Sequence, residues 1–145
     1  MTIRAPLWFL PALFLCACSA PQIQGAWHPE QYILPNGITH DVDGLIVFTE
    51  SDWNVLFFVT ENGEPRRASA EGGSFFFRGD RLILTHDYNF VYGDEVRGLA
   101  ATPPSYRILG AAAATEMCTV EMTEDFMTMF FPSGNSMTFR RSSGF

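Results

Sequence analysis

The chain has 145 residues, of which 47% are hydrophobic, and its nine basic side chains against sixteen carboxylates give a formal net charge of −7. This length predicts one domain with enough apolar residues to build a core. Every basic side chain is an arginine, and none stands in a cluster larger than a neighbouring pair, so the basic patch that binds nucleic acid is missing. The composition therefore excludes a nucleic-acid-binding protein.

The first residues have the layout of a secretory signal peptide. Arg4 supplies a positive charge, and residues 7–15 form an uncharged apolar run. A helix needs about 20 apolar residues to cross a bilayer, so this run is too short to be a transmembrane span. Residues 1–17 are therefore predicted to be removed during export.

The segment Leu15-Cys16-Ala17-Cys18 resembles the lipobox of bacterial lipoproteins. The resemblance implies lipidation of Cys18 and attachment to the membrane without a spanning segment. Ser19 resembles the residue that directs such lipoproteins to the outer membrane, which implies a location in the bacterial cell envelope, facing the periplasm. The alternative is ordinary secretory cleavage, which leaves a soluble periplasmic or secreted protein.

Residues 18–24 are predicted to be a short tether, and residues 25–142 to be the folded domain. Once Cys18 carries lipid, only Cys118 remains as a thiol, so the domain has no intramolecular disulfide and depends on its core.

From residue 25 onward the pattern predicts strands and turns without an amphipathic helix. Segments rich in β-branched and aromatic residues cover residues 25–34, 44–49, 53–60, 74–78, 81–86, 105–109, 117–122, 126–131 and 136–140. Short polar links between most of them suit antiparallel hairpins. Residues 62–73 and 87–104 are polar or interrupted by Gly and Pro, and are predicted to be loops at a barrel mouth. Ala111–Ala114 is either a helical turn or a bulge.

The alternation of apolar and polar residues indicates which faces are buried. Cys118 shares an apolar face with its alternate neighbours, so its side chain is predicted to point inward. The odd-numbered residues of 53–59 face the core, yet Leu56 and Phe58 are apolar on the opposite side. That second apolar face indicates contact with a packed loop, a partner or the membrane.

About eight consecutive antiparallel strands close naturally into a barrel, because closure removes exposed edges. The predicted fold class is therefore all-β: an eight-stranded (eight to nine) antiparallel up-and-down β-barrel. Such a barrel is either filled by side chains or holds one small ligand. The many bulky Phe, Met and Trp residues predict a small cavity at most.

Gly25-Ala26-Trp27 on the first strand, together with Arg140 and Arg141 on the last, resembles the lipocalin signature. In that fold the Trp plugs the closed end of the barrel and an Arg lies across its indole, a cation–π contact. Further segments give a wider resemblance to the bacterial lipocalin-like domain family; they lie at residues 44–50, 53, 69–74 and 131–135. The resemblance spans about residues 24–142 and implies a lipocalin-like fold more strongly than an activity.

The resemblance also implies that Gly25, Trp27 and one of the two arginines form a structural plug. Arg140 is slightly favoured over Arg141, because alternation places Arg140 opposite Phe139.

Several residues are candidates for ligand contact at the mouth: Arg67, Glu71, His86, Tyr88, Phe90 and Tyr92. Glu71 beside Arg66 and Arg67 suits a polar ligand head, although a bulge at the following glycines is the favoured interpretation. Tyr88 and its alternate neighbours put three rings on one face, which suits either a pocket entrance or ordinary core packing, and core packing is favoured.

Few other residues are candidates for metal binding or catalysis. No histidine stands at metal-ligand spacing from another His or Cys, so neither a metal nor a cofactor is predicted. His86 is predicted to be a half-buried residue at a strand end. No serine lies in a nucleophile-elbow context, and no catalytic residue is predicted.

Three functions remain open. The favoured one is an envelope lipoprotein that binds or sequesters a small hydrophobic molecule. The first alternative is a solid-barrel structural or interaction module with Leu56 and Phe58 in a partner surface. The second is a small isomerase-type enzyme with Glu71 or His86 as the base, although the sequence leans against an enzyme. The protein is expected to be a monomer attached to the membrane through a lipid anchor at Cys18.

Overall fold

The computed structural model describes residues 22–108, 110 and 113–143. The predicted signal peptide, Cys18 and residues 111–112 lie outside the described residues, so the expectations for them stay predictions. The described part of the chain forms ten strands: β1 (Gly25–Ile33), β2 (Thr39–Phe48), β3 (Asp52–Glu61), β4 (Glu64–Arg78), β5 (Arg81–His86), β6 (Tyr88–Gly93), β7 (Thr102–Ile108), β8 (Ala114–Met122), β9 (Phe126–Phe130) and β10 (Ser136–Arg141).

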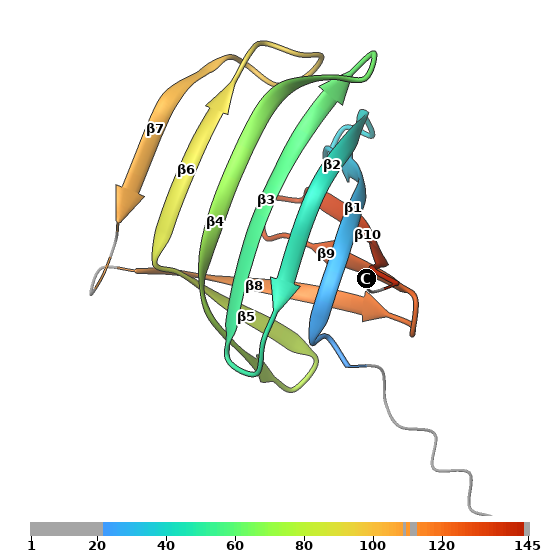
Figure 1. Ribbon diagram of the computed structural model, residues 1–145, viewed down its shortest axis with the longest axis vertical. Helices are drawn as coiled ribbons and strands as arrows, with labels where there is room; N and C mark the ends of the chain where they lie inside the picture. Colours follow the sequence, from blue (N-terminus) through green and yellow to red (C-terminus); the bar gives the residue numbers. More distant parts are fainter. Residues whose placement is uncertain (1–21, 109, 111–112, 144–145) are drawn as a thin grey trace, which may run out of the picture.

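Eight of these strands close into an antiparallel barrel. The strands follow one another around the barrel in the order β1, β2, β3, β4, β5, β8, β9 and β10, and β10 pairs back to β1. β6 and β7 lie outside this circle and extend the sheet from β4, as Figure 1 shows. The predicted fold class is confirmed. No helix in the described residues is long and apolar enough to cross a membrane.

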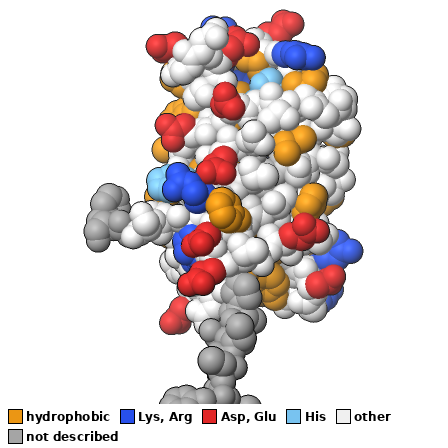
Figure 2. Space-filling model, turned by 90° about the vertical axis from the view of Figure 1, so that its right-hand side faces the viewer, with side chains coloured by type: hydrophobic (Ala, Val, Ile, Leu, Met, Phe, Trp, Pro, Cys, Tyr) orange, Lys and Arg blue, Asp and Glu red, His pale blue; other side chains and the backbone are white. Residues whose placement is uncertain are grey.

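The surface carries the acidic excess of the sequence. On the face in Figure 2, Asp and Glu side chains are spread over the barrel with fewer arginines among them. The net charge of −7 gives the molecule a field that attracts cations and repels anions.

Strand β4 is the longest, and the sheet forks along it. One edge of β4 pairs with β3, while the other pairs with β6 over Arg67–Gly72 and with β5 over Phe75–Arg78. Gly72 and Gly73 stand at the fork. A Cβ on Gly73 would collide with the backbone carbonyl of Thr85, and one on Gly72 with the hydroxyl of Tyr88. Glycine is therefore required where β5 and β6 diverge from β4.

The two predicted mouth loops are mostly strands. Residues 64–73 form the first two-thirds of β4, and β6 and β7 occupy much of 87–104. The first part of β4 looked like a loop because its inner face carries polar side chains and its outer face small ones. The prolines at 103 and 104 are tolerated because β7 is an edge strand and its pairing with β6 is irregular at these two residues.

Trp27 plugs one end of the barrel. Its side chain is fully buried, and its indole N–H donates a hydrogen bond to the carbonyl oxygen of Ile23 at 2.8 Å. The guanidinium of Arg141 lies over the indole, with its central carbon 3.9 Å from the ring centroid. Gly25 has a φ of +119°, and a Cβ there would lie 3.2 Å from Arg141 Nη1. The absence of a side chain at Gly25 therefore leaves room for the arginine.

The preference for Arg140 as the capping residue is wrong. Met137 and Phe139 are buried, so alternation brings Arg141, not Arg140, to the inner side. In addition, β1 pairs Trp27 directly with Arg141. Arg140 instead forms an exposed ion pair with Glu30, at 2.9 Å between Nε and Oε1.

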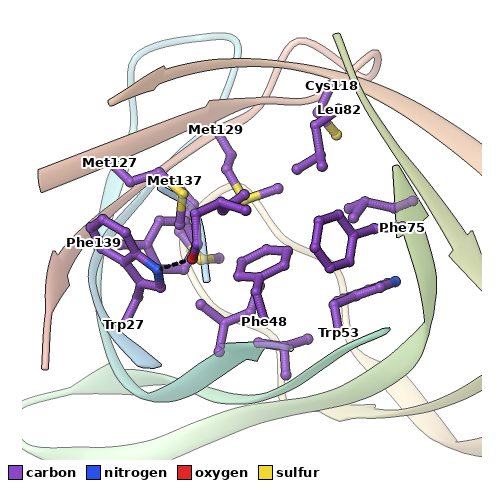
Figure 3. Packing of buried hydrophobic residues seen from close by; sticks show 14 residues of the cluster. Trp27, Phe48, Trp53, Phe75, Leu82, Cys118, Met127, Met129, Met137 and Phe139 are labelled. Carbon is purple, nitrogen blue, oxygen red and sulfur yellow. Dashed lines mark hydrogen bonds between the residues drawn. The ribbon is translucent and has the colours of Figure 1, made fainter. Parts of the chain in front are cut away.

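The core lies beside the plug and continues along the barrel (Figure 3). The largest fully buried side chains come from strands all around the barrel: Trp27, Phe48, Phe139, Leu82, Leu84, Met127 and Met129. Cys118 is also fully buried, as predicted, and burial raises the pKa of its thiol to about 12. The thiol therefore stays protonated and packs as a small apolar group.

Candidate functional site

A cavity of about 190 Å³ lies inside the barrel. Its floor is apolar and includes Ile46, Val55, Leu84, Met129 and Met137. An apolar cavity of about 150 Å³ is enough to bind benzene, so this one suits a molecule of one to two aromatic rings. The barrel is therefore not solid, and the cavity stays within the prediction of a small one at most.

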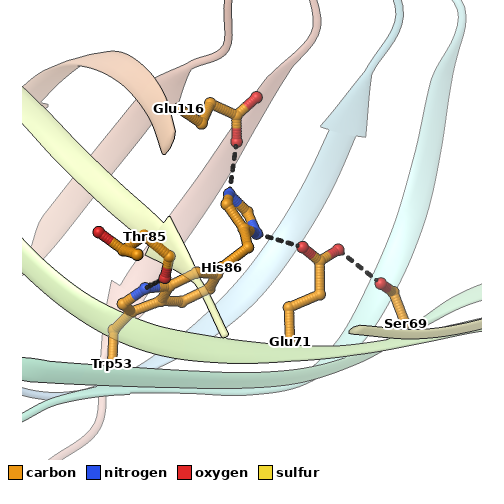
Figure 4. Close-up of polar contacts among 6 residues, drawn as sticks. All are labelled: Trp53, Ser69, Glu71, Thr85, His86 and Glu116. Atoms are coloured by element: carbon orange, nitrogen blue, oxygen red, sulfur yellow. Dashed lines mark hydrogen bonds and ion pairs between the residues drawn. The ribbon is translucent and has the colours of Figure 1, made fainter. Parts of the chain in front are cut away.

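One wall of the cavity is charged and consists of Glu71, His86 and Glu116 (Figure 4). His86 Nδ1 lies 2.8 Å from Glu71 Oε2, and His86 Nε2 lies 3.5 Å from Glu116 Oε2. Glu71 also accepts a hydrogen bond from the Ser69 hydroxyl at 2.9 Å. We call Glu71, His86 and Glu116 the acidic triad.

Three different strands bring the acidic triad together at the fork. Glu71 lies on β4 just before the glycines, His86 ends β5, and Glu116 lies near the start of β8. The ring of Trp53 meets the His86 imidazole edge to face, with centroids 5.2 Å apart. The Trp53 indole N–H donates to the carbonyl oxygen of Thr85 at 3.1 Å, which fixes the orientation of that ring.

The triad carries a net negative charge at neutral pH. Hydrogen bonds to Glu116 and then Glu71 raise the pKa of His86 to about 9, so its imidazole is protonated. Burial alone would raise the pKa of Glu71, but hydrogen bonds from His86, Ser69 and Asn89 outweigh it and lower that pKa. One cation thus faces two carboxylates.

The rim of the cavity offers a neutral donor. Asn135 Nδ2 donates a hydrogen bond to the Tyr32 hydroxyl oxygen at 2.7 Å, which leaves the hydroxyl proton of Tyr32 free to donate. Burial raises the pKa of Tyr32, so this proton stays in place. Ser133 also lines the cavity, and because it is exposed, the cavity reaches the surface beside it.

Arg67, a predicted ligand contact, does not line the cavity. Its guanidinium donates to the carbonyl oxygens of Asp94 and Ala100 at 2.6 and 2.8 Å, and to the Thr102 hydroxyl at 2.9 Å. Arg67 therefore holds both ends of the loop at residues 94–101. Arg66 pairs with the Asp94 carboxylate at 3.2 Å. The less favoured interpretation, in which Glu71 and these two arginines hold a ligand head, is therefore wrong, because both arginines bind this loop.

The loop at 94–101 crosses the open end of the barrel. Gly98 has a φ of +81°, and a Cβ there would lie 2.9 Å from side-chain methyls of Leu34 and Ile38. These two residues flank the turn between β1 and β2, so the loop reaches from the β6–β7 side to the opposite rim (Figure 1).

Tyr88, Phe90 and Tyr92 lie on the outer face of the sheet, so both the favoured core packing and the alternative place at a pocket entrance are wrong. β6 pairs Asn89 with Glu71 and Phe90 with Ala70, so the polar residues of β6 share the inner face with Glu71. The three rings are about 40% exposed. The register between β4 and β6, which the sequence does not reveal, determines which face of β6 points into the barrel.

An apolar row crosses the outer face of five strands. The paired residues are Leu45, Leu56, Ala70, Phe90 and Tyr106, on β2, β3, β4, β6 and β7. Leu56 is 44% exposed and Tyr106 is 80% exposed. The apolar side of β3 that the sequence indicated is therefore part of a wider exposed surface.

Sequence reasoning named Glu71 and His86 but missed Glu116, Tyr32 and Asn135. Glu116 had a signal, because alternation from the inward Cys118 places it on the same inner face. The contact between Tyr32 and Asn135 joins residues 103 positions apart and had no local signal.

The triad geometry does not favour the isomerase alternative. His86 is protonated and both its nitrogens face carboxylates, while both oxygens of Glu71 accept hydrogen bonds. Neither residue is a free base near neutral pH. Within the described residues, no group of three or more His, Cys, Asp or Glu side chains is arranged to hold a metal ion.

Comparison with solved structures finds two similar chains. The crystal structure of a lipocalin-like protein from Bacteroides uniformis superposes with a TM-score of 0.50 at 13% identity, covering 82% of this chain and 97% of that one. An uncharacterized protein from Bacteroides eggerthii gives 0.49 at 15% identity, covering 82% and 98%. No protein-family model and no curated protein matches the sequence. The likeness to the first structure supports a lipocalin-like fold for this chain.

Proposed function

We propose that this lipocalin-like barrel belongs to an envelope lipoprotein that binds a small, largely apolar molecule in its cavity. The cavity carries the proposal: about 190 Å³ of space with an apolar floor and a few polar groups on its wall and rim. That combination is typical of small-molecule sites, in which apolar surface supplies affinity and a few polar groups fix orientation.

Binding can be followed at the cavity's own methionines. The strands and core lie within residues 23–141, so a soluble form comprising residues 19–145 keeps the whole barrel. With methyl-labelled methionine, indole is expected to shift the NMR signals of Met129 and Met137 saturably. The exposed Met117 is an internal reference and is expected not to shift. No saturable change at Met129 and Met137 would count against a binding role.

Two neighbouring substitutions separate cavity binding from surface binding. Val55 lines the cavity, whereas Leu56, the next residue on β3, faces outward. Val55→Phe is expected to fill the space and abolish the indole response, while Leu56→Phe adds a ring outside and preserves it. A response that survives Val55→Phe but not Leu56→Phe would place indole on the outer face.

The lipid anchor is a separate part of the proposal, supported by the lipobox-like segment ending at Cys18. Expression in a bacterium with an alkyne-tagged fatty acid is expected to label the wild-type protein. Cys18→Ala is expected to remove the label, and Cys16→Ala to retain it. Labelling that is unaffected by Cys18→Ala would reject Cys18 as the anchor, and no labelling of the wild-type protein would leave the soluble alternative.

A second candidate function is an interaction module, favoured by the apolar row on the outer face. Among the described strands, β7 has an unpaired edge, and Tyr106 and Ile108 beside it are 80% and 86% exposed. Edge strands pair readily with another strand. The occupant that fits is the β7 edge of a second copy, because Pro103 and Pro104 limit pairing to the short segment that follows them.

Sedimentation velocity tests this second candidate against the expectation of a monomer. Self-association is expected to be concentration-dependent and to disappear in Tyr106→Ser. Arg107→Ser, on the opposite face of the same strand, is the matched control and is expected to leave association intact. A monomer at all concentrations would reject this function without affecting the cavity.

A further inference from the structure

We propose that the cavity selects small aromatic molecules that carry a protonated amine and rejects those that carry a carboxylate. This inference rests on the proposed binding function and specifies the chemistry of its ligand. It follows from which polar groups on the cavity wall are still available for an occupant.

The acidic triad can still accept a hydrogen bond from a ligand, but it has no N–H group left to donate one. Both His86 nitrogens already face carboxylate oxygens, so His86 offers no N–H to an anionic ligand. Glu71 uses both oxygens, on His86 and Ser69. Among the described contacts, Glu116 meets only His86, at 3.5 Å through one oxygen, so its other oxygen remains available. An ammonium group supplies the donor and the positive charge that this carboxylate lacks.

The cation on the cavity wall, His86, is already paired with two carboxylates, and no arginine lines the cavity among the described residues. Arg67 is bound to the loop at 94–101 and does not line the cavity. Arg107 shares the inner face with Glu71 through the paired Asn89, but it is exposed and lies two strands away. Water and salt screen a charge at that distance more than one in contact with the ligand. The charged contact available to an occupant is therefore the Glu116 carboxylate.

The rest of the cavity fits the apolar part of the same molecule. Trp53 and Phe57 line the cavity beside the apolar floor and supply aromatic surface that suits an aromatic group. The Tyr32 hydroxyl offers only a neutral hydrogen bond at the rim. The volume holds one to two rings, so a long-chain fatty acid is too large for the cavity as well as wrongly charged.

Three probes of similar size and different charge test the inference: 2-phenylethylamine, 2-phenylethanol and phenylacetate. We expect the amine to bind at least about tenfold more tightly than the alcohol, and the carboxylate not to bind measurably, by titration of the Met129 and Met137 methyl signals. Equal binding of amine and alcohol, or tighter binding of phenylacetate, would overturn the charge preference while leaving the cavity a binding site. Failure of all three probes together with indole would instead reject the proposed function.

A pair of variants on β8 tests whether Glu116 is the recognising group. Glu116→Gln keeps the shape but removes the charge, and is expected to weaken amine binding about tenfold without changing alcohol binding. Glu121→Gln is the matched control, because Glu121 is exposed on the opposite face of the same strand. The methyl spectrum reports whether each variant keeps its fold. Equal weakening of amine and alcohol in Glu116→Gln, or none, would contradict the role of this carboxylate.

Discussion

The two ends of the barrel differ in the role of their charged side chains. At the plugged end, Trp27 is enclosed by apolar side chains, and the Arg141 guanidinium lies across the indole with its N–H groups directed to the carbonyl oxygens of Gln22, Gln24 and Glu124. Where the sheet forks along β4, which we call the forked end, Glu71, His86 and Glu116 face the cavity. Charge at the first end closes the barrel, whereas charge at the second lines a space that a ligand can enter.

Removal of the plug tests the first half of this comparison. Trp27→Ala is expected to lower the free energy of unfolding by about 3–5 kcal/mol, because the ring is surrounded on all sides and its loss leaves a void. Urea unfolding followed by circular dichroism measures this loss. Trp53→Ala is the matched control and is expected to cost less, because that ring already borders the cavity. An equal or larger loss for Trp53→Ala would show that the two ends are packed alike.

The plugged end was largely predictable from sequence because its signals are local. Gly25 and Trp27 stand in one tripeptide, and the buried Met137 and Phe139 establish an alternation that continues to Arg141. The choice of Arg140 failed because its place opposite Phe139 puts it on the outer face, whereas the cap shares the inner face with Met137 and Phe139. Local periodicity was sufficient to identify the cap.

The forked end was not predictable in the same way, because register decides its geometry. The first part of β4 places Ser69 and Glu71 inside and small residues outside, which is the reverse of the usual hydrophobic pattern. β6 then continues that face, so Tyr88 and its alternate neighbours point outward. Glu71 and His86 were recognisable as unusual residues, but their meeting with Glu116 depends on two strand pairings, β4 with β5 and β5 with β8.

The pH dependence of stability tests the second half of the comparison. The pKa of His86 is raised from about 6.5 to about 9 on folding, so its contribution is fully present below pH 6.5 and is lost as pH rises through 9. The pKa of Glu71 is lowered, so its contribution is present above about pH 4.5 and is lost as pH falls through its folded value. Stability due to the triad is therefore greatest between about pH 5 and 6.5.

Unfolding free energies at pH 6 and pH 9.5 measure this effect. The wild-type protein is expected to lose about 2 kcal/mol between them, less than the full pKa shift gives, because water reaches both carboxylates. His86→Gln removes the titrating group and serves as the control for all other charges. If His86→Gln retains the wild-type pH dependence, the triad does not stabilise the forked end.

Substitution of Arg140 and of Arg141, the last two residues of β10, is expected to change the free energy of unfolding by smaller amounts. Arg141→Gln is expected to cost about 1–2 kcal/mol, because it removes the contact over Trp27 and the hydrogen bonds to backbone carbonyls. Arg140→Gln is expected to cost less than about 0.5 kcal/mol, because its ion pair with Glu30 is exposed. Urea midpoints measure both changes, and the reverse order would restore Arg140 as the cap.

The loop over the open end is expected to give the smallest global effect, because it packs on the barrel without being part of it. Arg67→Gln removes the donors that hold Asp94 and Ala100, and is expected to change the free energy of unfolding by less than about 1 kcal/mol. Hydrogen exchange at Val96 and Leu99, whose amides bond to each other's carbonyls, is nevertheless expected to speed up about tenfold.

Arg66→Gln is the matched control for the loop, since it removes only an ion pair with Asp94 that solvent reaches. It is expected to leave exchange at Val96 and Leu99 unchanged. Faster exchange in β1 as well as in the loop would mean that Arg67 supports the barrel itself. Exchange confined to the loop would mean that the open end can loosen while the end plugged by Trp27 stays closed, which is the asymmetry that entry of a ligand requires.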